Sequence, residues 1–330
     1  MANQNRQTVG RSPASRAPGA DPAPRSRGMA VGIAYILASA LCFGSMPIFA
    51  RRALASGADV PTLLLLRFSL AAACMWLVLL ARGLALPRGR VLLLLVAMGA
   101  VGYAGQATCY FQAITLASVG LVSLLLYLYP ALVALLAWLV LGQPLTRLQV
   151  AALAIALAGS ALTIGRAGDG QPLGILLGFL AAVVYAVYIL VGSRIPAAVS
   201  ATAATTVITT AAAAACGAVA AAHGLHLQNQ PAGWVAVLAV AGVGGVLAIL
   251  FFFEGMERVG PVRASVFSTV EPLFSVLLAA LLLGEAITPL RVLGGVCILA
   301  SVILLAWEGL RPPAGARRAD DAAERLIQGT

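Results

Sequence analysis

The sequence predicts an all-α polytopic membrane protein, with ten transmembrane helices arranged as two inverted five-helix repeats around a central cavity. Of the 330 residues, 61% are hydrophobic and only 10% are charged, far from the balance of a soluble globular domain. About ten apolar stretches have the length of roughly 20 residues that spans a bilayer core. The two halves of the chain also repeat each other at an offset of 142 residues.

The ten helices follow one another with short connections. They are expected at residues 29–50, 61–81, 91–115, 119–141, 147–165, 173–193, 203–223, 233–256, 262–284 and 289–308. The first apolar run is longer than the core of a secretory signal peptide and nine more follow it, so it is expected to be a retained helix. Residues 1–28 and 309–330 have the composition of disordered tails.

The repeat sets the domain organisation, with one unit at 29–166 and the other at 172–308. The aligned positions include Tyr110-Phe111-Gln112 with Phe252-Phe253-Glu254, Ser123 with Ser265, Pro130 with Pro272, Gly142-Gln143 with Gly284-Glu285, and Thr146 with Thr288. Because five is an odd number, the second unit enters the bilayer from the opposite side. Inverted repeats place a substrate site near the midplane between the halves, although a duplication can also persist as architecture alone.

The distribution of positive charge predicts the orientation. The chain has a formal net charge of +10. With both termini in the cytoplasm, the inner ends and tails hold 16 of the 21 arginines, and the outer side holds four. This asymmetry is the positive-inside rule. It accounts for the basic charge without nucleic-acid binding, and it predicts a multi-pass protein of a bacterial-type inner (plasma) membrane.

Several motifs resemble those of a known family. The second half carries Ser-Val-Phe-Ser-Thr-Val-Glu271-Pro272-Leu-Phe and Leu-Leu-Leu-Gly284-Glu285-Ala-Ile-Thr288, and the first half carries Arg67-Phe68, Tyr129-Pro130 and Leu-Gly142-Gln143-Pro-Leu-Thr146. Together they resemble the EamA family of the drug/metabolite transporter (DMT) superfamily, over roughly residues 29–308. The resemblance implies ten helices around a central cavity, commonly with export of amino acids or other small metabolites. Gln143 departs from the family, which often has Glu there.

Glu271 is the acid expected near mid-membrane. On a helical wheel it shares a polar arc with Ser268, Thr269, Pro272 and Ser275, and these residues are predicted to face the cavity. A carboxylate at such a depth is costly, so it should face protein or water. It either attracts a cationic or amino-bearing substrate, binds and releases a coupled proton, or is a structural, hydrogen-bonded acid.

Proline is expected to disturb both of the equivalent helices. Pro272 lacks an N–H, so the carbonyl of Ser268 loses its helical partner and a kink or open carbonyl should result. Pro130 is the matching helix-break candidate, and both are candidates for gating. Tyr129 is the repeat counterpart of Glu271, and with Tyr127 it either stacks on a substrate or serves packing.

Three further charged residues have a predicted role, and for two of them more than one role is open. Arg67 is the only basic residue well inside a predicted span, where it binds a substrate carboxylate, pairs with an interior acid, or extends to the interface. Glu254 is a gate candidate through Arg258 or Arg263, or else a solvated helix end. Glu285 follows Gly284 before the helix start at Thr288-Pro289, and is interpreted as a structural boundary residue.

The absent residue types narrow the function. There is no lysine, so a Walker A motif is excluded and secondary transport is expected. Neither HExxH nor GxSxG occurs, the five cysteines have no CxxC spacing, and no enzyme activity, metal or cofactor is predicted. The predicted function is a secondary active exporter of amino acids or related metabolites, whose partners are a small-molecule substrate, a coupled proton and membrane lipid. A monomer is compatible with the sequence.

Alternatives of the same fold are an uptake permease or cationic-drug efflux. A non-transporting membrane receptor or scaffold is the alternative of another class.

Overall fold

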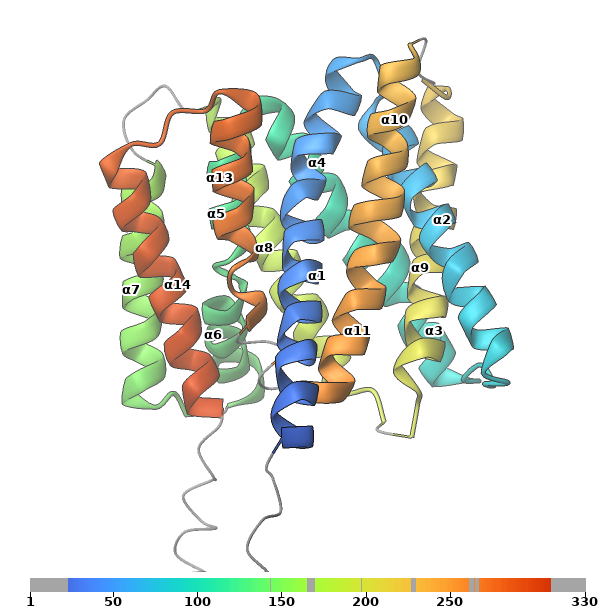
Figure 1. Cartoon of the computed structure of the whole chain (residues 1–330), viewed down its shortest axis with the longest axis horizontal. Coiled ribbons are helices and arrows are strands. Elements are labelled where there is room, and N and C mark those ends of the chain that lie inside the picture. Colours follow the sequence, from blue (N-terminus) through green and yellow to red (C-terminus); the bar gives the residue numbers. More distant parts are fainter. Residues whose placement is uncertain are drawn as a thin grey trace, which may run out of the picture.

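The computed structural model describes residues 23–142, 144–164, 170–196, 198–226, 230–260, 264 and 267–309. Within these ranges every regular element is a helix (Figure 1), which confirms the all-helical fold class. Of the tails predicted at 1–28 and 309–330, residues 1–22 and 310–330 lie outside the described residues, as do Gln143, Arg263 and Ser265, while residues 23–28 belong to α1 and Gly309 to α14.

The helices are α1 (Ala23–Ala55), α2 (Val60–Ala81), α3 (Arg90–Ala97), η1 (Met98–Tyr103), α4 (Ala104–Leu116), α5 (Val119–Leu126), α6 (Tyr129–Leu141), α7 (Arg147–Ile164), α8 (Pro172–Gly192), α9 (Ala201–His223), α10 (Pro231–Ala239), η2 (Val240–Leu247), α11 (Ala248–Val259), α13 (Glu271–Leu283) and α14 (Pro289–Gly309). The elements η1 and η2 are π-helical stretches that continue from an α-helix on either side.

Eight helical stretches of the described chain are long and apolar enough to cross a membrane. They coincide with eight of the ten predicted segments. The other two predicted segments contain shorter apolar helices, Arg147–Thr163 and Glu271–Leu283. The protein is therefore a multi-pass membrane protein, and the count of ten spans stays a prediction.

Two of the predicted spans are interrupted beside Pro130 and Pro272, the residues predicted to disturb them. A turn at residues 127–128 separates α5 from α6, and a turn at residues 269–270 precedes α13. Proline is the second residue of both α6 and α13, at Pro130 and Pro272. Proline cannot donate the backbone hydrogen bond that would join the two helical pieces, but it is well tolerated in the first turn of a new helix.

The internal repeat is visible in the irregular features of the helices. The π-helical stretches η1 and η2, the turns before Tyr129 and before Glu271, and the starts of α7 and α14 all recur at the offset of 142 residues. Each half also ends its broken helix on a left-handed glycine, Gly142 with φ 67° and Gly284 with φ 69°. Distortions that cost backbone hydrogen bonds thus recur at matching positions in both halves.

Helix packing follows the same relation. Helix α1 packs on α11 and α13, and its counterpart α8 packs on α4 and α6; α2 pairs with α9, α5 with α13, and α7 with α14. Except for α5 with α13, each pair maps onto itself or onto another pair when the halves are exchanged. Figure 1 shows α7 and α14 together at one edge of the bundle, and the start of α1 and the end of α14 at the same end.

Small residues allow the closest of these contacts. A Cβ atom at Gly159 of α7 would lie only 2.7 Å from the carbonyl oxygen of Gly294 in α14. Membrane helices associate through this kind of close backbone approach because lipid supplies no hydrophobic force between them.

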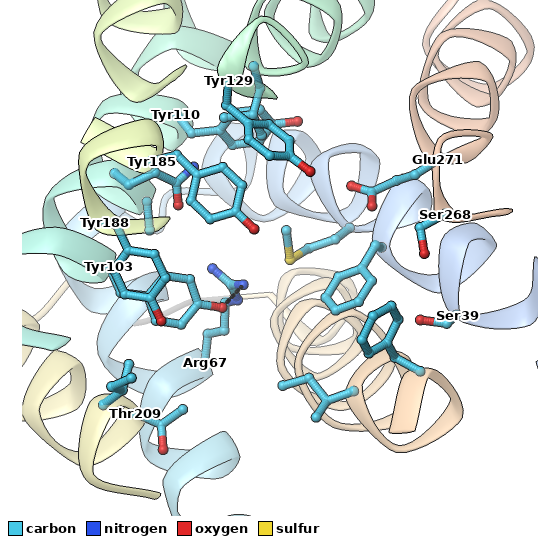
Figure 2. Close-up of a pocket in the computed structure, with 18 of the residues that line it drawn as sticks. Ser39, Arg67, Tyr103, Tyr110, Tyr129, Tyr185, Tyr188, Thr209, Ser268 and Glu271 are labelled. Atoms are coloured by element: carbon cyan, nitrogen blue, oxygen red, sulfur yellow. Dashed lines mark hydrogen bonds between the residues drawn. The ribbon is translucent and has the colours of Figure 1, made fainter. Parts of the chain in front are cut away.

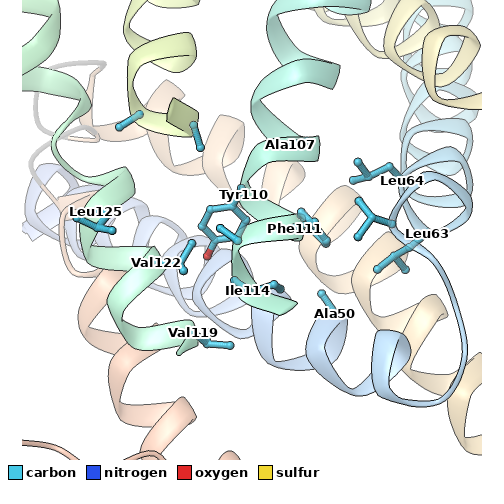
Figure 3. Packing of buried hydrophobic residues seen from close by; sticks show 14 of the residues in the cluster. Ala50, Leu63, Leu64, Ala107, Tyr110, Phe111, Ile114, Val119, Val122 and Leu125 are labelled. Carbon is cyan, nitrogen blue, oxygen red and sulfur yellow. The ribbon is translucent and has the colours of Figure 1, made fainter. Parts of the chain in front are cut away.

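The buried core gathers around α4. Its side chains Ala107, Tyr110, Phe111 and Ile114 recur at helical spacing and are at most 5% exposed. They belong to one cluster with residues of α1, α2 and α5 (Figure 3), among them Ala50, Leu63, Leu64, Val119, Val122 and Leu125. This packing holds α4 firmly, and α4 carries one wall of the cavity described next.

Candidate functional site

A cavity of about 490 Å³ lies where the two halves meet. Helices α1, α2, α4, α5, α6, α8, α9, α11 and α13 contribute to it, together with Tyr103 of η1, Tyr127 of the turn after α5, and Ser268, which precedes the turn before α13; α7 and α14 contribute no lining residue among those described. The lining residues are Ser39, Ala40, Phe43, Met46, Arg67, Tyr103, Gln106, Ala107, Tyr110, Phe111, Leu126, Tyr127, Tyr129, Tyr185, Tyr188, Thr205, Ile208, Thr209, Ile249, Phe252, Phe253, Ser268 and Glu271.

Glu271 enters the cavity from the first residue of α13. Its position in the first turn places the carboxylate near the positive end of the helix dipole, which stabilises negative charge. The helix is anchored beside it because Ser275 Oγ donates a hydrogen bond of 3.0 Å to the carbonyl of Gly44 in α1. A Cβ at Gly44 would lie 2.8 Å from the Glu271 carbonyl oxygen, so α1 and α13 touch through their backbones.

The carbonyl that Pro272 leaves open has a partner from the other half. Tyr127, in the turn between α5 and α6, donates its hydroxyl to the Ser268 carbonyl at 3.3 Å. Tyr127 and Glu271 both line the cavity at this point. The helix break of the first half therefore supports the helix break of the second, directly beside the acid.

Arg67 is buried in the opposite part of the cavity. Its side chain is 5% exposed, so the guanidinium does not extend to the interface. Nη2 donates to the Tyr103 hydroxyl at 3.2 Å, and Cζ lies 5.0 Å from the ring centre of Phe68 and 5.6 Å from that of Phe111. In the part of the chain that the structure describes, Nε has no hydrogen-bond partner and Arg67 forms no ion pair.

Six of the seven tyrosines of the chain line the cavity. They are named the tyrosine wall and comprise Tyr103, Tyr110, Tyr127, Tyr129, Tyr185 and Tyr188. Five of them form a continuous run of ring contacts, Tyr103 to Tyr188 at 6.0 Å, Tyr188 to Tyr185 at 6.0 Å, Tyr185 to Tyr129 at 4.6 Å, and Tyr129 to Tyr127 at 6.0 Å. The run begins at the hydroxyl that binds Arg67 and ends at the hydroxyl beside Glu271.

Figure 2 shows how the walls divide the polar groups. The labelled tyrosines lie on one side, Glu271, Ser268 and Ser39 lie across from them, and the Arg67 guanidinium points in from below the tyrosines. The cavity therefore presents one cation, one acid and a row of hydroxyls to whatever occupies it.

The lining follows the repeat in position but not in chemistry. Sixteen of the lining residues form eight pairs that are 142 positions apart: Phe43 with Tyr185, Met46 with Tyr188, Arg67 with Thr209, Ala107 with Ile249, Tyr110 with Phe252, Phe111 with Phe253, Leu126 with Ser268, and Tyr129 with Glu271. In three of these pairs, one half has a tyrosine where the other half has a phenylalanine or a methionine. The phenolic hydroxyls thus belong to one wall only, although both walls include equivalent positions of the repeat.

Not all of the predicted site residues reach the cavity. Glu271, Arg67, Tyr127, Tyr129 and Ser268 line it, whereas Ser275 and Thr269 are buried outside the lining. Pro130 and Pro272 start α6 and α13. Glu254 lies outside the cavity, where its carboxylate pairs with Arg258 at 2.5 Å and both side chains are exposed.

Sequence reasoning missed the tyrosines of η1, α4 and α8, with Gln106 and Thr209. The signal that would have found two of them is the spacing of Tyr185 and Tyr188, three residues apart within an apolar span. No group of three or more His, Cys, Asp or Glu side chains suited to a metal occurs among the described residues.

Comparisons with known proteins agree with this architecture. The profile of the EamA-like transporter family matches residues 30–165 and 172–307. An uncharacterized transporter of Synechocystis sp. is 25% identical over 207 residues, which are 59% of this chain and 61% of that protein, so the match spans less than two thirds of the relative. One solved crystal structure, 23% identical, shares the fold with a TM-score of 0.58, over 87% of this chain and all (100%) of the other.

Proposed function

The chain belongs to the EamA-like transporter family, within the DMT superfamily, and from that premise we propose that it is a secondary active transporter that exports amino acids or related small metabolites across the inner (plasma) membrane. The single observation that carries the proposal is the cavity between the halves, which brings Arg67 and Glu271 together inside an apolar helical bundle. Charged groups at such depth are costly and mark substrate or ion pathways. Export and the substrate class are supported by the family resemblance.

We propose alternating access between inverted repeats as the mechanism. The helix pairings that map onto one another under exchange of the halves support it, because such a structure can exchange the conformations of its two halves around a fixed site. The odd number of predicted helices per repeat supports the inversion, and the excess of arginine at the inner ends supports cytoplasmic termini.

Glu271 is proposed to be the coupling residue of the cycle. It is the only acid in the cavity lining among the described residues, and it lies at a helix break that both halves stabilise. It binds either a proton or an amino group of the substrate. Ser268 and Tyr127 line the cavity beside it, and Pro130 and Pro272 are proposed as the points about which the broken helices move.

Flux measurements in proteoliposomes test the proposal. The purified chain is reconstituted and supplied with labelled amino acids, organic cations and nucleosides, with and without a proton gradient. Glu271→Gln is expected to lower flux at least about ten-fold or to remove its dependence on the gradient. Glu254→Gln, a matched change at an exposed acid outside the cavity, is expected to retain wild-type flux.

Three outcomes would count against the proposal. If wild-type protein moves none of the compounds under any condition, the chain is not a transporter of these classes. If it moves organic cations but no amino acid, the efflux alternative replaces amino-acid export. If Glu271→Gln keeps the wild-type rate and gradient dependence, Glu271 is a structural acid.

A further inference from the structure

We infer that Arg67 binds a carboxylate group of the transported substrate, so that the cavity accepts organic anions and zwitterions and rejects close analogues without an anionic group. This assignment rests on the proposed function, since it concerns the occupant of the same cavity. Its starting point is the environment of the guanidinium, which is almost fully buried yet has no acid beside it in the described part of the chain.

The missing counter-charge is the first step of the argument. A buried charge is normally paired with an opposite charge, because an apolar environment does not replace the hydration energy that the charge loses when it leaves water. The two described ion pairs join His226 with Asp59 and Arg258 with Glu254, and neither includes Arg67. Aromatic rings around the guanidinium attract it, but they carry no net charge. An anionic ligand would complete the site.

The orientation of the guanidinium is the second step. Tyr103 accepts a hydrogen bond from Nη2, while the rings of Phe68, Tyr103 and Phe111 lie 5.0 to 5.8 Å from Cζ. These contacts hold the planar group in place, and Nε keeps a donor without a partner among the described residues. An arginine side edge offers Nε and a terminal nitrogen in parallel, which matches the two oxygens of a carboxylate.

Glu271 does not take this role in the structure. Both residues line the cavity, yet they lie on different sides of it (Figure 2). Their separation leaves the space between them to the ligand. A zwitterion fits both groups, whereas a cation without an acid group would meet Glu271 and leave the Arg67 charge unpaired.

A binding assay tests the inference without any need for transport. The full-length protein is purified in detergent, and its thermal unfolding is followed with four probes that share a phenyl ring: phenylacetate, neutral phenylacetamide, cationic phenethylamine and tetrahedral phenylphosphonate. A ligand that binds the folded state raises Tm in proportion to its affinity and concentration. Phenylacetate is expected to bind at least about ten-fold more tightly than phenylacetamide, and phenethylamine is expected to bind more weakly than phenylacetate.

Variants assign that preference to Arg67. Arg67→Gln is expected to bind phenylacetate and phenylacetamide about equally, and Arg67→Lys to retain a weaker preference, since an ammonium cannot pair in a bidentate manner. Arg82→Gln removes a positive charge from the exposed end of the same helix and is expected to behave as wild type. Without ligand, Arg67→Gln is expected to have a Tm equal to or above that of wild type, because it removes an uncompensated buried charge.

The contrary results are distinct. The inference is refuted if no carboxylate probe stabilises the wild-type chain, if the amide binds as well as the carboxylate, or if Arg67→Gln keeps the preference. A preference for phenylphosphonate would replace the carboxylate by a tetrahedral anion and also overturn it. If Arg67→Gln does not fold, Arg67→Lys and Arg82→Gln are compared instead. A weaker preference for phenylacetate over phenylacetamide in Arg67→Lys alone supports the inference, and an equal preference in both variants refutes it. Anion binding without flux would refute the proposed function alone, whereas flux of a substrate without an anionic group would refute this inference alone.

Discussion

Glu285 is predicted to stabilise the fold by capping a helix of the other half. Its two carboxylate oxygens accept hydrogen bonds from the backbone N–H groups of Val119 at 2.7 Å and Gly120 at 3.0 Å, at the start of α5. Ser118, the N-cap residue, makes no such bond with its own side chain. A helix cap is worth about 0.5 to 2 kcal/mol, and a hydrogen bond to a charged group about 1.5 to 3 kcal/mol. Glu285→Ala should therefore lower the free energy of unfolding by about 2 to 4 kcal/mol.

Thermal unfolding of the purified chain measures this loss. At about 2 °C of Tm for each kcal/mol in a large chain, Glu285→Ala should unfold several degrees below wild type. Glu285→Gln keeps one acceptor oxygen and should fall about halfway between. Glu254→Ala is the matched control, because its pair with Arg258 is exposed to solvent and such pairs contribute little to stability. Equal Tm values for Glu285→Ala and Glu254→Ala would refute the assignment of Glu285 as a cap between the halves.

Two more predictions concern the helix breaks. Tyr127→Phe removes the hydroxyl that donates to the Ser268 carbonyl. It should lower the free energy of unfolding by about 1 kcal/mol, measured as Tm, and reduce flux in proteoliposomes. Wild-type values of both would exclude a supporting role for this hydrogen bond. Gly142→Ala and Gly284→Ala place a Cβ at backbone positions with φ of 67° and 69°. Each change should lower the free energy of unfolding by about 1 to 2 kcal/mol, measured as Tm. An unchanged Tm in both variants would contradict the left-handed caps.

Much of the fold follows from the sequence because the bilayer imposes a length on each span. The predicted segments all coincide with helices, and the offset that aligns Pro130 with Pro272 also aligns the turns and π-helical stretches of the structure. The disturbance of the fourth and ninth helices follows from Pro130 and Pro272, but the full turn that precedes each of them does not. A hydrophobic run predicts that a segment lies in lipid. It does not predict where a backbone group within the segment bonds to another helix instead of to its own, as the Ser268 carbonyl does with Tyr127.

The candidate site was predictable at Glu271 and at positions related to it by the helical wheel or the repeat, such as Ser268 and Tyr129. Glu271 could be placed in the interior because a charge in lipid is costly, whereas Arg67 could equally have extended to the interface, and the tyrosines of α8 carry no such cost and left no comparable signal. Ser275 shares the polar arc of Glu271 on an unbroken helical wheel. In the structure it lies one turn beyond Glu271 in α13, where its hydroxyl donates to the Gly44 carbonyl of the neighbouring helix α1 and does not reach the cavity.

The unequal chemistry of equivalent positions bears on how the transporter would work. If access alternates by exchange of the conformations of the two halves, Tyr129 and Glu271 exchange environments while each keeps its own chemistry. An acid at both positions would give two equivalent sites for a proton or an amino group, and like charges at close range oppose each other. One acid and one phenol give a single group whose charge responds to the side from which it is reached. Under the proposed mechanism, the equivalent positions of the lining supply the symmetry for movement between two states, and the presence of tyrosine at 129 opposite Glu271 would make those two states chemically different.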